Sequence, residues 1–328
     1  MAVDLTEDVA SRIRSKLSNP SIVTEGNAAL FGLLDRTTGR SMRFVTHGDI
    51  SPTHILRLGS LTKTLLAFIA LKHRIPLNEP VEAHLKTLHH SHYPGSDEIT
   101  FRHLLNHTSG VFSFTELPNA TKLAPMFSPT VLVDLAWRDR SLMFVPGSAR
   151  FYSNTNSEIV AMWLMQLTQE CPRTLFEQEF RQHGLTTLTL DSGEDGDFPM
   201  NTNGYRDFNM PFSFPSASGR LLADAKDILI AMDIMASEKE IWEKMKLWTD
   251  APLFPDPDNP AGGQKYGLFL QEFQFKGNTL AYGHDGHIGV STLACVTPEH
   301  VLLIHATVDM CTEKWMAYVS SIMDEVLV

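Results

Sequence analysis

The stretch Gly59–Lys63, with the sequence GSLTK, decides how this chain is organised, and an apolar run that ends at Leu71 follows it directly. Three residues make nearly one helical turn, so Ser60 and Lys63 lie on the same face of a helix that begins here. The positive end of the helix dipole favours an anion at the Ser60 oxygen, and apolar neighbours can keep Lys63 desolvated and able to accept a proton. The pattern therefore predicts a nucleophile beside its own base.

In the alternative, purely structural interpretation, Ser60 only caps a helix and Lys63 points into water. Two observations argue against it. GSLTK contains the only S-x-x-K of the chain, and side chains of a suitable type occur downstream. Tyr152 and Asn154 form the only Y-x-N, on a turn ahead of an apolar helix, where a phenol and an amide can enter one cavity.

Composition limits the class of protein that can hold such a site. The 328 residues are 43% hydrophobic and 20% charged, which is ordinary for a globular enzyme and sufficient for a large core. The formal net charge of -11 and the lack of a Lys/Arg-rich run disfavour nucleic acid as a partner. We therefore expect a small-molecule substrate, and the oligomeric state stays open.

Cysteine usage and the first residues indicate the compartment. Cys171, Cys295 and Cys311 are odd in number and widely spaced, which predicts reduced, mostly buried thiols rather than a disulfide framework or a zinc site. Acidic residues follow Met1 where a signal peptide needs basic ones, and no stretch approaches the roughly 18 apolar residues of a membrane span. These features predict a cytoplasmic protein without membrane contact, and no motif requires a metal or another cofactor.

The first third of the chain alternates between helical and strand patterns. Apolar spacing predicts a helix over Thr6–Leu17 with Thr6 as its N-cap, and strands at 28–34 and 41–46 precede the helix at Ser60. A later proline-punctuated stretch contains four histidines, His84, His89, His90 and His92. Because no carboxylate or cysteine stands among them at a ligand spacing, we interpret this stretch as a solvated loop rather than a metal site.

Helices predominate in the middle of the chain, and strands return near its end. Helices are expected over 101–107, 131–137, 159–167 and 223–235, and again over 312–327 at the C-terminus. The first of these should end at a left-handed Gly110, and residues 193–215 should form a long surface loop. Strands are expected over 266–275, 280–283, 290–296 and 301–308.

The stretch Gly283–Gly289 is expected at a turn between two of these strands. Glycines at a strand edge let a substrate approach closely, and a free N–H there can stabilise an oxyanion, whereas the alternative is a tight hairpin with a surface histidine. Strands at both ends with helices between them imply an α/β (α+β) fold, an antiparallel sheet flanked by helices with an inserted all-helical region. We assign 1–75 and 215–328 to the α/β domain and 76–214 to a mainly helical domain, with the active site in the cleft between them.

The motifs Ser60-x-x-Lys63, Tyr152-x-Asn154 and His284-x-Gly286, in this order, resemble those of the serine beta-lactamase and penicillin-binding protein superfamily. Its class C-like and family VIII-type esterase or transesterase branch is the most similar. Further stretches that resemble this branch are RHLLNHTSG at 102–110, FVPG at 144–147, SGRL at 218–221 and YGL at 266–268. The resemblance extends from about residue 25 to the C-terminus and implies a beta-lactamase/transpeptidase-like fold.

The resemblance also implies a role for each matching position. Ser60 would attack a carbonyl carbon, and Lys63 and Tyr152 would share the proton transfers. Asn154 would orient the acyl group and Lys63. The backbone N–H groups of Ser60 and His287 would form the oxyanion hole. The third motif, His284 and Gly286, would line the substrate site beside His287.

Two departures from the family pattern bear on the substrate. Members that act on beta-lactams commonly carry Lys where this chain has His284, and a small hydroxylated residue where it has Asp285. These differences favour ester or thioester chemistry over beta-lactam hydrolysis. The lack of an export signal argues against peptidoglycan as the substrate.

These observations favour a serine hydrolase or acyltransferase that forms an acyl-enzyme on Ser60 with a small ester, thioester or amide, a chemistry found in specialised metabolism. A nucleophile-elbow hydrolase is disfavoured because no G-x-S-x-G occurs. Two alternatives stay open. One is a fold relative that binds or rearranges a ligand in the same cavity without acyl transfer, against which the joint presence of Ser60, Lys63 and Tyr152 argues. The other is a peptidase for small D-amino-acid peptides.

Overall fold

A computed structural model of the chain describes residues 6–85, 93–117, 129–191, 216–254, 265–287, 289–308 and 310–327. The loop expected at 193–215 and three of the four clustered histidines (His89, His90 and His92) lie outside these ranges. The fourth, His84, contacts Glu79 through its ring at 2.6 Å. No described helix is both long and apolar enough to cross a membrane.

The described secondary structure follows the expected order of helices and strands. The helices are α1 (Glu7–Leu17), α2 (Leu61–Lys72), α3 (Phe101–Leu105), α5 (Pro129–Trp137), α6 (Asn154–Thr168), α7 (Pro172–Arg181), α8 (Ser216–Gly219), α9 (Ala225–Ser237), α10 (Lys239–Met245) and α11 (Thr312–Val326). The strands are β1 (Ala29–Asp35), β2 (Met42–His47), β3 (Leu56–Arg57), β4 (Thr189–Leu190), β5 (Leu221–Ala223), β6 (Gln271–Gln274), β7 (Leu280–His287), β8 (Ser291–Val296) and β9 (His300–Ala306).

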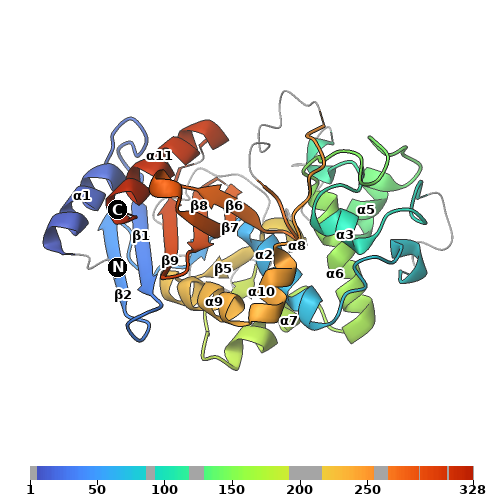
Figure 1. Cartoon of the computed structure of the whole chain (residues 1–328), viewed down its shortest axis with the longest axis horizontal. Helices are drawn as coiled ribbons and strands as arrows, with labels where there is room; N and C mark the ends of the chain where they lie inside the picture. The colour runs from blue at the N-terminus through green and yellow to red at the C-terminus, as the bar shows by residue number, and fades with distance from the viewer. Residues whose placement is uncertain are drawn as a thin grey trace.

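An antiparallel sheet joins the two ends of the chain. Its strand order is β2-β1-β9-β8-β7-β6, so N-terminal β1 pairs along its whole length with C-terminal β9. Figure 1 shows α1 and α11 on one face of this sheet and α9 on the other. A smaller sheet, β3-β5-β4, lies beside α2. The expected antiparallel α/β fold is confirmed.

Both faces of β1 are covered, which explains its uninterrupted apolar sequence. All of its residues are buried. Phe31 and Leu33 belong to the core shared with Trp315 of α11, whereas Leu30 and Leu34 belong to the core around α2 and α9. Successive side chains of a strand point to opposite faces, so one apolar strand supplies both cores.

Helix α2 lies at the centre of the molecule, between the sheet and a group of helices that includes α3, α5 and α6 (Figure 1). Its residues from Leu61 to Leu71 are all buried. A helix that is apolar on every side is stable only when other elements surround it, and α2 contacts α6, α7, α8, α10 and β7. The division of the chain at residues 75 and 214 stays a prediction.

Three sequence expectations were wrong in detail. Gly283 to His287 do not form a turn but lie within β7, between β6 and β8. The strand expected from residue 266 is shorter, because Phe269 adopts a φ of +48° and interrupts it before Gln271. Helix α3 ends at Leu105 with Asn106 as its C-cap, and the next residue, His107, has a left-handed φ of +60°. Gly110, at +76°, comes later.

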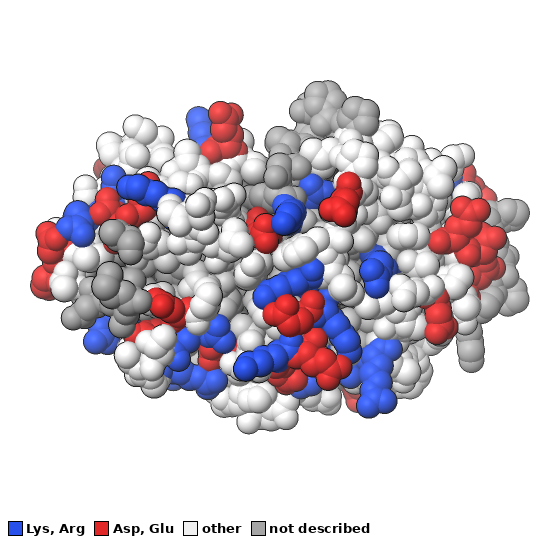
Figure 2. Space-filling view, in the orientation of Figure 1, with Lys and Arg blue, Asp and Glu red and all other residues white. Residues whose placement is uncertain are grey.

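Only one of the three cysteines is buried, although the sequence predicted mostly buried thiols. Cys295 is buried, but Cys171 and Cys311 are exposed, because each stands at the N-cap of a surface helix. On the face shown in Figure 2, basic side chains lie among acidic ones rather than in one continuous field.

Candidate active site

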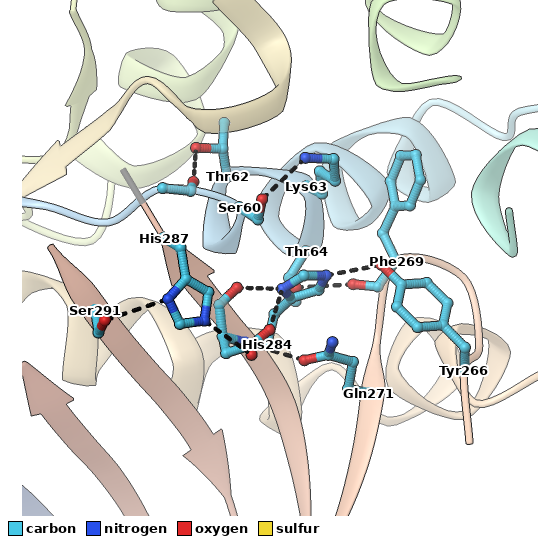
Figure 3. Close-up of polar contacts among 12 residues, drawn as sticks. Ser60, Thr62, Lys63, Thr64, Tyr266, Phe269, Gln271, His284, His287 and Ser291 are labelled. Carbon is cyan, nitrogen blue, oxygen red and sulfur yellow. Dashed lines mark hydrogen bonds and ion pairs between the residues drawn. The ribbon is translucent and has the colours of Figure 1, made fainter. Parts of the chain in front are cut away.

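Ser60 stands at the start of α2 with a hydroxyl that is free to react. It occupies the N-cap position, but its backbone is helical (φ -64°, ψ -9°) and its side chain makes no capping hydrogen bond. Gly59 precedes it with a φ of +52°, a conformation that favours glycine and turns the chain sharply into the helix. The hydroxyl is thereby directed toward Lys63 one turn later (Figure 3).

Lys63 is fully buried and its amine has three oxygen neighbours. Nζ lies 3.1 Å from Ser60 Oγ, 2.8 Å from Asn154 Oδ1 and 2.6 Å from the carbonyl oxygen of Ser218. These partners come from the starts of α2 and α6 and from α8. The amine is thus held next to the nucleophile by groups that are distant in sequence.

The buried position of Lys63 changes its protonation. Burial lowers the pKa of the ammonium to about 7, against the opposing effect of two carboxylates, Glu158 and Asp285. Glu158 is itself buried and accepts a hydrogen bond from the Ala217 backbone N–H at 3.0 Å. Near pH 7 a large fraction of Lys63 is therefore neutral and can accept a proton.

The second motif brings a phenol and an amide to the same lysine. Lys63 Nζ lies 4.9 Å from the centre of the Tyr152 ring. Asn154 donates through Nδ2 to Thr115 Oγ1 at 3.1 Å, which turns its Oδ1 toward Lys63. The structure thus brings together Ser60, Lys63, Tyr152 and Asn154, as the motifs predict.

The Tyr152 hydroxyl is buried, and within the described part of the chain no group meets the full geometry of a hydrogen bond to it. Burial raises the pKa of the phenol, the nearby Ser60 side chain lowers it, and the Asp285 charge raises it again, with a net rise. The free phenol is therefore protonated at neutral pH. It can donate a proton, or relay one toward Lys63, more readily than it can act as a resting phenolate.

His284, the first residue of the third motif, is set back from Ser60 rather than pointing at it. The ring is fully buried and lies between the Tyr266 hydroxyl, 2.7 Å from Nε2, and the carbonyl oxygen of Asp285 next to Nδ1 (Figure 3). A carbonyl oxygen only accepts, so Nδ1 carries the proton and Nε2 accepts from Tyr266. Burial lowers the pKa of His284 to about 4 despite the Asp285 charge, so the ring is neutral at pH 7.

The rest of the third motif packs directly against the start of α2. A Cβ atom placed on Gly59 would stand 2.9 Å from the His287 nitrogen, and one on Gly286 would stand 2.9 Å from the Ser60 nitrogen. The start of α2 and strand β7 therefore pack closely here. The backbone nitrogens of Ser60 and His287, which are expected to form the oxyanion hole, both lie at this contact. Two contacts hold the His287 ring: Nε2 lies 3.3 Å from Asp285 Oδ2, and Nδ1 lies 3.2 Å from Ser291 Oγ.

Sequence reasoning missed several residues of this site. Glu158 and Thr115 support Lys63 and Asn154, Tyr266 holds His284, and the carbonyl group of Ser218 contacts Lys63. YGL at 266–268 and SGRL at 218–221 pointed to two of these segments but not to a role. For Glu158, the only signal was a lone carboxylate directly before the apolar run that begins at Ile159.

Comparisons with known proteins agree with this geometry. The Beta-lactamase family model matches residues 22–324. Among solved structures, a D-stereospecific amidohydrolase from Streptomyces sp. is 23% identical with a TM-score of 0.77, and the match covers 97% of this chain and 98% of that one. D-amino acid amidase from Ochrobactrum anthropi SV3, complexed with L-phenylalanine, is 18% identical with a TM-score of 0.78 and 98% of both chains covered.

A third solved structure is an octameric penicillin-binding protein homologue from Pyrococcus abyssi. It is 15% identical with a TM-score of 0.70, over 98% of this chain and 77% of that one. At these identities the likeness shows a shared fold. Together with the family match over nearly the whole chain, it confirms the resemblance seen in the three motifs: the chain belongs to the Beta-lactamase family, within the serine beta-lactamase and transpeptidase superfamily.

Proposed function

We propose that this protein is a serine acyl hydrolase that forms an acyl-enzyme on Ser60 and acts on small amides or esters without a free carboxylate. The observation that carries the proposal is the buried amine of Lys63, 3.1 Å from Ser60 Oγ, with a pKa of about 7. A lysine in water is neutral only about once in several thousand molecules at pH 7, whereas burial makes the neutral form of this one abundant near that pH. It can therefore act as a base at neutral pH.

Lys63 and Tyr152 carry out the proton transfers of the proposed reaction. Neutral Lys63 takes the Ser60 hydroxyl proton while Oγ bonds to the carbonyl carbon, and the Ser60 and His287 N–H groups stabilise the resulting oxyanion. The tetrahedral intermediate collapses as the Tyr152 phenol gives its proton to the leaving amine or alcohol, and the Lys63 ammonium reprotonates Tyr152. Water then attacks the Oγ ester by the same steps in reverse, and a second acceptor in place of water would make the enzyme a transferase.

The substrate class follows from the charge of the third motif. A lysine in place of His284 would supply a fixed positive charge for a substrate carboxylate, but His284 is neutral and enclosed by Tyr266 and Asp285. A neutral amide or ester has no carboxylate beside its scissile carbonyl group, so it does not require such a charge. The same observation favours a second candidate, amides of D-amino acids, because one structurally similar enzyme is named a D-amino acid amidase.

Covalent labelling tests the proposal. A fluorophosphonate should add once to the wild-type protein, as seen by intact mass, and Ser60→Ala should abolish the mass shift. Ser321→Ala is the matched control, because the Ser321 hydroxyl donates to the Tyr318 carbonyl oxygen within α11 and belongs to no part of the proposed acyl transfer. Equal labelling of wild type and Ser60→Ala would place the nucleophile elsewhere and favour the ligand-binding alternative.

A substrate panel then separates the two candidates. Turnover of short-chain aryl esters together with D-amino acid amides, and not of the L-amides, would assign the enzyme to the D-amidase group. Turnover of the esters alone would assign it to the esterase group. Stable acylation by a thioester, released only when an amine or alcohol is added, would identify an acyltransferase.

A further inference from the structure

His107 lies behind Tyr152 and takes no part in the acyl transfer proposed above. The residue is 1% exposed and follows the end of α3. Its φ of +60° is uncommon for a residue other than glycine and is a strained conformation that the surroundings must enforce. Such strain persists only where other contacts hold the residue in place, so the contacts of His107 are informative.

His107 binds the backbone on both sides of Tyr152. The N–H of Phe151 donates to the His107 carbonyl oxygen at 3.0 Å. The N–H of Ser153 donates to the His107 ring nitrogen Nδ1 at 3.1 Å. One residue therefore fixes the peptide groups before and after the proposed acid. The left-handed backbone of His107 is what lets its carbonyl group and its ring reach the same short segment.

The hydrogen bonds also fix the tautomer of the ring. Asn156 Oδ1 accepts from Ser109 Oγ at 2.8 Å, so the Asn156 Nδ2 group faces His107 Nδ1, 3.1 Å away, and donates to it. Because Nδ1 accepts from Ser153 and Asn156, the ring proton lies on Nε2. Burial, with the nearby positive charges of Lys63 and Arg150 adding to it, lowers the pKa of His107 well below its usual value, so the ring stays neutral.

The imidazole ring also supports the phenol ring directly. The His107 and Tyr152 ring centres are 4.3 Å apart with an angle of 32° between the planes. Tyr266 and Phe269 close the other sides of the imidazole at 5.0 Å and 5.1 Å. The Tyr152 ring therefore rests on a surface that is itself enclosed, which limits the directions in which its hydroxyl can point.

The second ring nitrogen plays no part in this support. Nε2 is buried and, among the described residues, has no hydrogen-bond partner. His107 lines a cavity of about 20 Å³ together with Arg150, Tyr152 and Tyr266. A cavity of that size holds about one water molecule.

We infer that His107 is a positioning residue that holds Tyr152 in its proton-transfer geometry through the acceptor at Nδ1 and the carbonyl oxygen, without touching the reacting atoms. The inference rests on the role proposed above for Tyr152. It assigns a mechanistic reason to the histidine of the HTSG stretch at 107–110, which the sequence identified only as part of a stretch that resembles the family.

A matched pair of amide variants separates the two ring nitrogens. In His107→Asn the side-chain oxygen stands near the position of Nδ1, and asparagine tolerates the left-handed backbone. In His107→Gln the longer side chain carries its amide near the position of Nε2 and leaves Ser153 N–H without its acceptor. We expect Gln to lower kcat by about 10- to 100-fold with KM within about twofold, the effect of misplacing a reacting group, and Asn to stay within about threefold of wild type.

A double-mutant cycle with Tyr152→Phe tests whether His107 acts through Tyr152. If it does, His107→Gln should cost at most about twofold in kcat in the Tyr152→Phe background, because the group that it positions is already absent. Equal losses in both backgrounds, or equal losses for Asn and Gln, would overturn the inference and leave His107 a purely structural residue. Wild-type turnover by the single variant Tyr152→Phe would overturn the proposed role of Tyr152 itself. This result is read from the single variant and is therefore distinguishable from a failure of the inference about His107.

Asn156→Ala provides a second route if the His107 variants do not fold. It removes the donor that orients the imidazole without changing residue 107 or its backbone. We expect a smaller fall in kcat in the same direction, which disappears in the Tyr152→Phe background. An undiminished fall in that background would contradict the inference, and thermal unfolding of each variant shows that folded proteins are being compared.

Discussion

Gly286 and Ser60 lie back to back, although they come from opposite ends of the chain. A Cβ atom on Gly286 would stand 2.9 Å from the Ser60 nitrogen and 2.2 Å from the carbonyl oxygen of Leu58. Both atoms belong to the backbone and cannot rotate away. Strand β7 can therefore approach the start of α2 only with glycine at this position, and this approach brings the His287 nitrogen next to Gly59.

The first prediction concerns this contact. Gly286→Ala should push β7 away from Ser60, destabilise the fold by about 1–3 kcal/mol and lower kcat by about 10²- to 10³-fold, as the loss of an oxyanion donor does. Urea unfolding and ester turnover measure the two effects. Gly277→Ala is the control, because no atom stands within 4 Å of the added Cβ and only its φ of +71° opposes the change. Equal activity of the two variants would show that the contact does not shape the oxyanion hole.

The second prediction concerns the protonation of Lys63. Its pKa of about 7 means that the neutral, proton-accepting form grows as pH rises, so kcat/KM should increase about tenfold per pH unit below pH 7 and level off above it. Lys63→Met should lower the acylation rate by about 10²- to 10⁴-fold at pH 8. Lys72→Met, at the other end of the same helix, should leave the rate unchanged. A profile without an inflection near pH 7 would exclude Lys63 as the titrating base.

The third prediction concerns the substrate. The wild-type enzyme should show a higher kcat/KM for an uncharged ester or amide than for a chromogenic cephalosporin, because His284 is neutral and enclosed. His284→Lys should shift this ratio toward the carboxylate-bearing cephalosporin. His284→Gln, which adds no charge, should leave it unchanged. A cephalosporin preference in the wild type would contradict the proposed substrate class.

The fourth prediction concerns acid stability. His284 and His305 are fully buried, and burial lowers their pKa values to about 4 and about 3. The unfolded chain binds these protons near pH 6.5, before the folded one does. Each histidine should therefore reduce the free energy of unfolding by up to about 1.4 kcal/mol per pH unit as pH falls from 6.5 toward 4.

Urea unfolding at pH 7.5, 6 and 5 measures this slope. His305→Asn should make the slope shallower, because one of the protons taken up on unfolding is lost. Replacement of the exposed His183 by Asn should leave it unchanged. An identical slope in wild type and His305→Asn would rule out a contribution from His305.

Several features of the fold and of the site depend only on neighbours along the chain and can be predicted from the sequence. Ser60 and Lys63 share a helix face because three residues make nearly one turn, and no distant contact is needed for that. Thr6 caps α1 and the apolar β1 sequence forms a strand for similarly local reasons. The Tyr152-x-Asn154 pattern identified a second group of candidate site residues. The order of the three motifs was enough to predict the family.

Tertiary structure alone decided the features that depend on distant partners. Glycine-rich β7 is a strand because β6 and β8 bond to it, although its composition is typical of a turn. His107 takes its left-handed conformation where the segment around Tyr152 packs on it. The pKa of Lys63 has the same origin, because desolvation depends on every element that surrounds the amine, and no spacing along the chain encodes that enclosure.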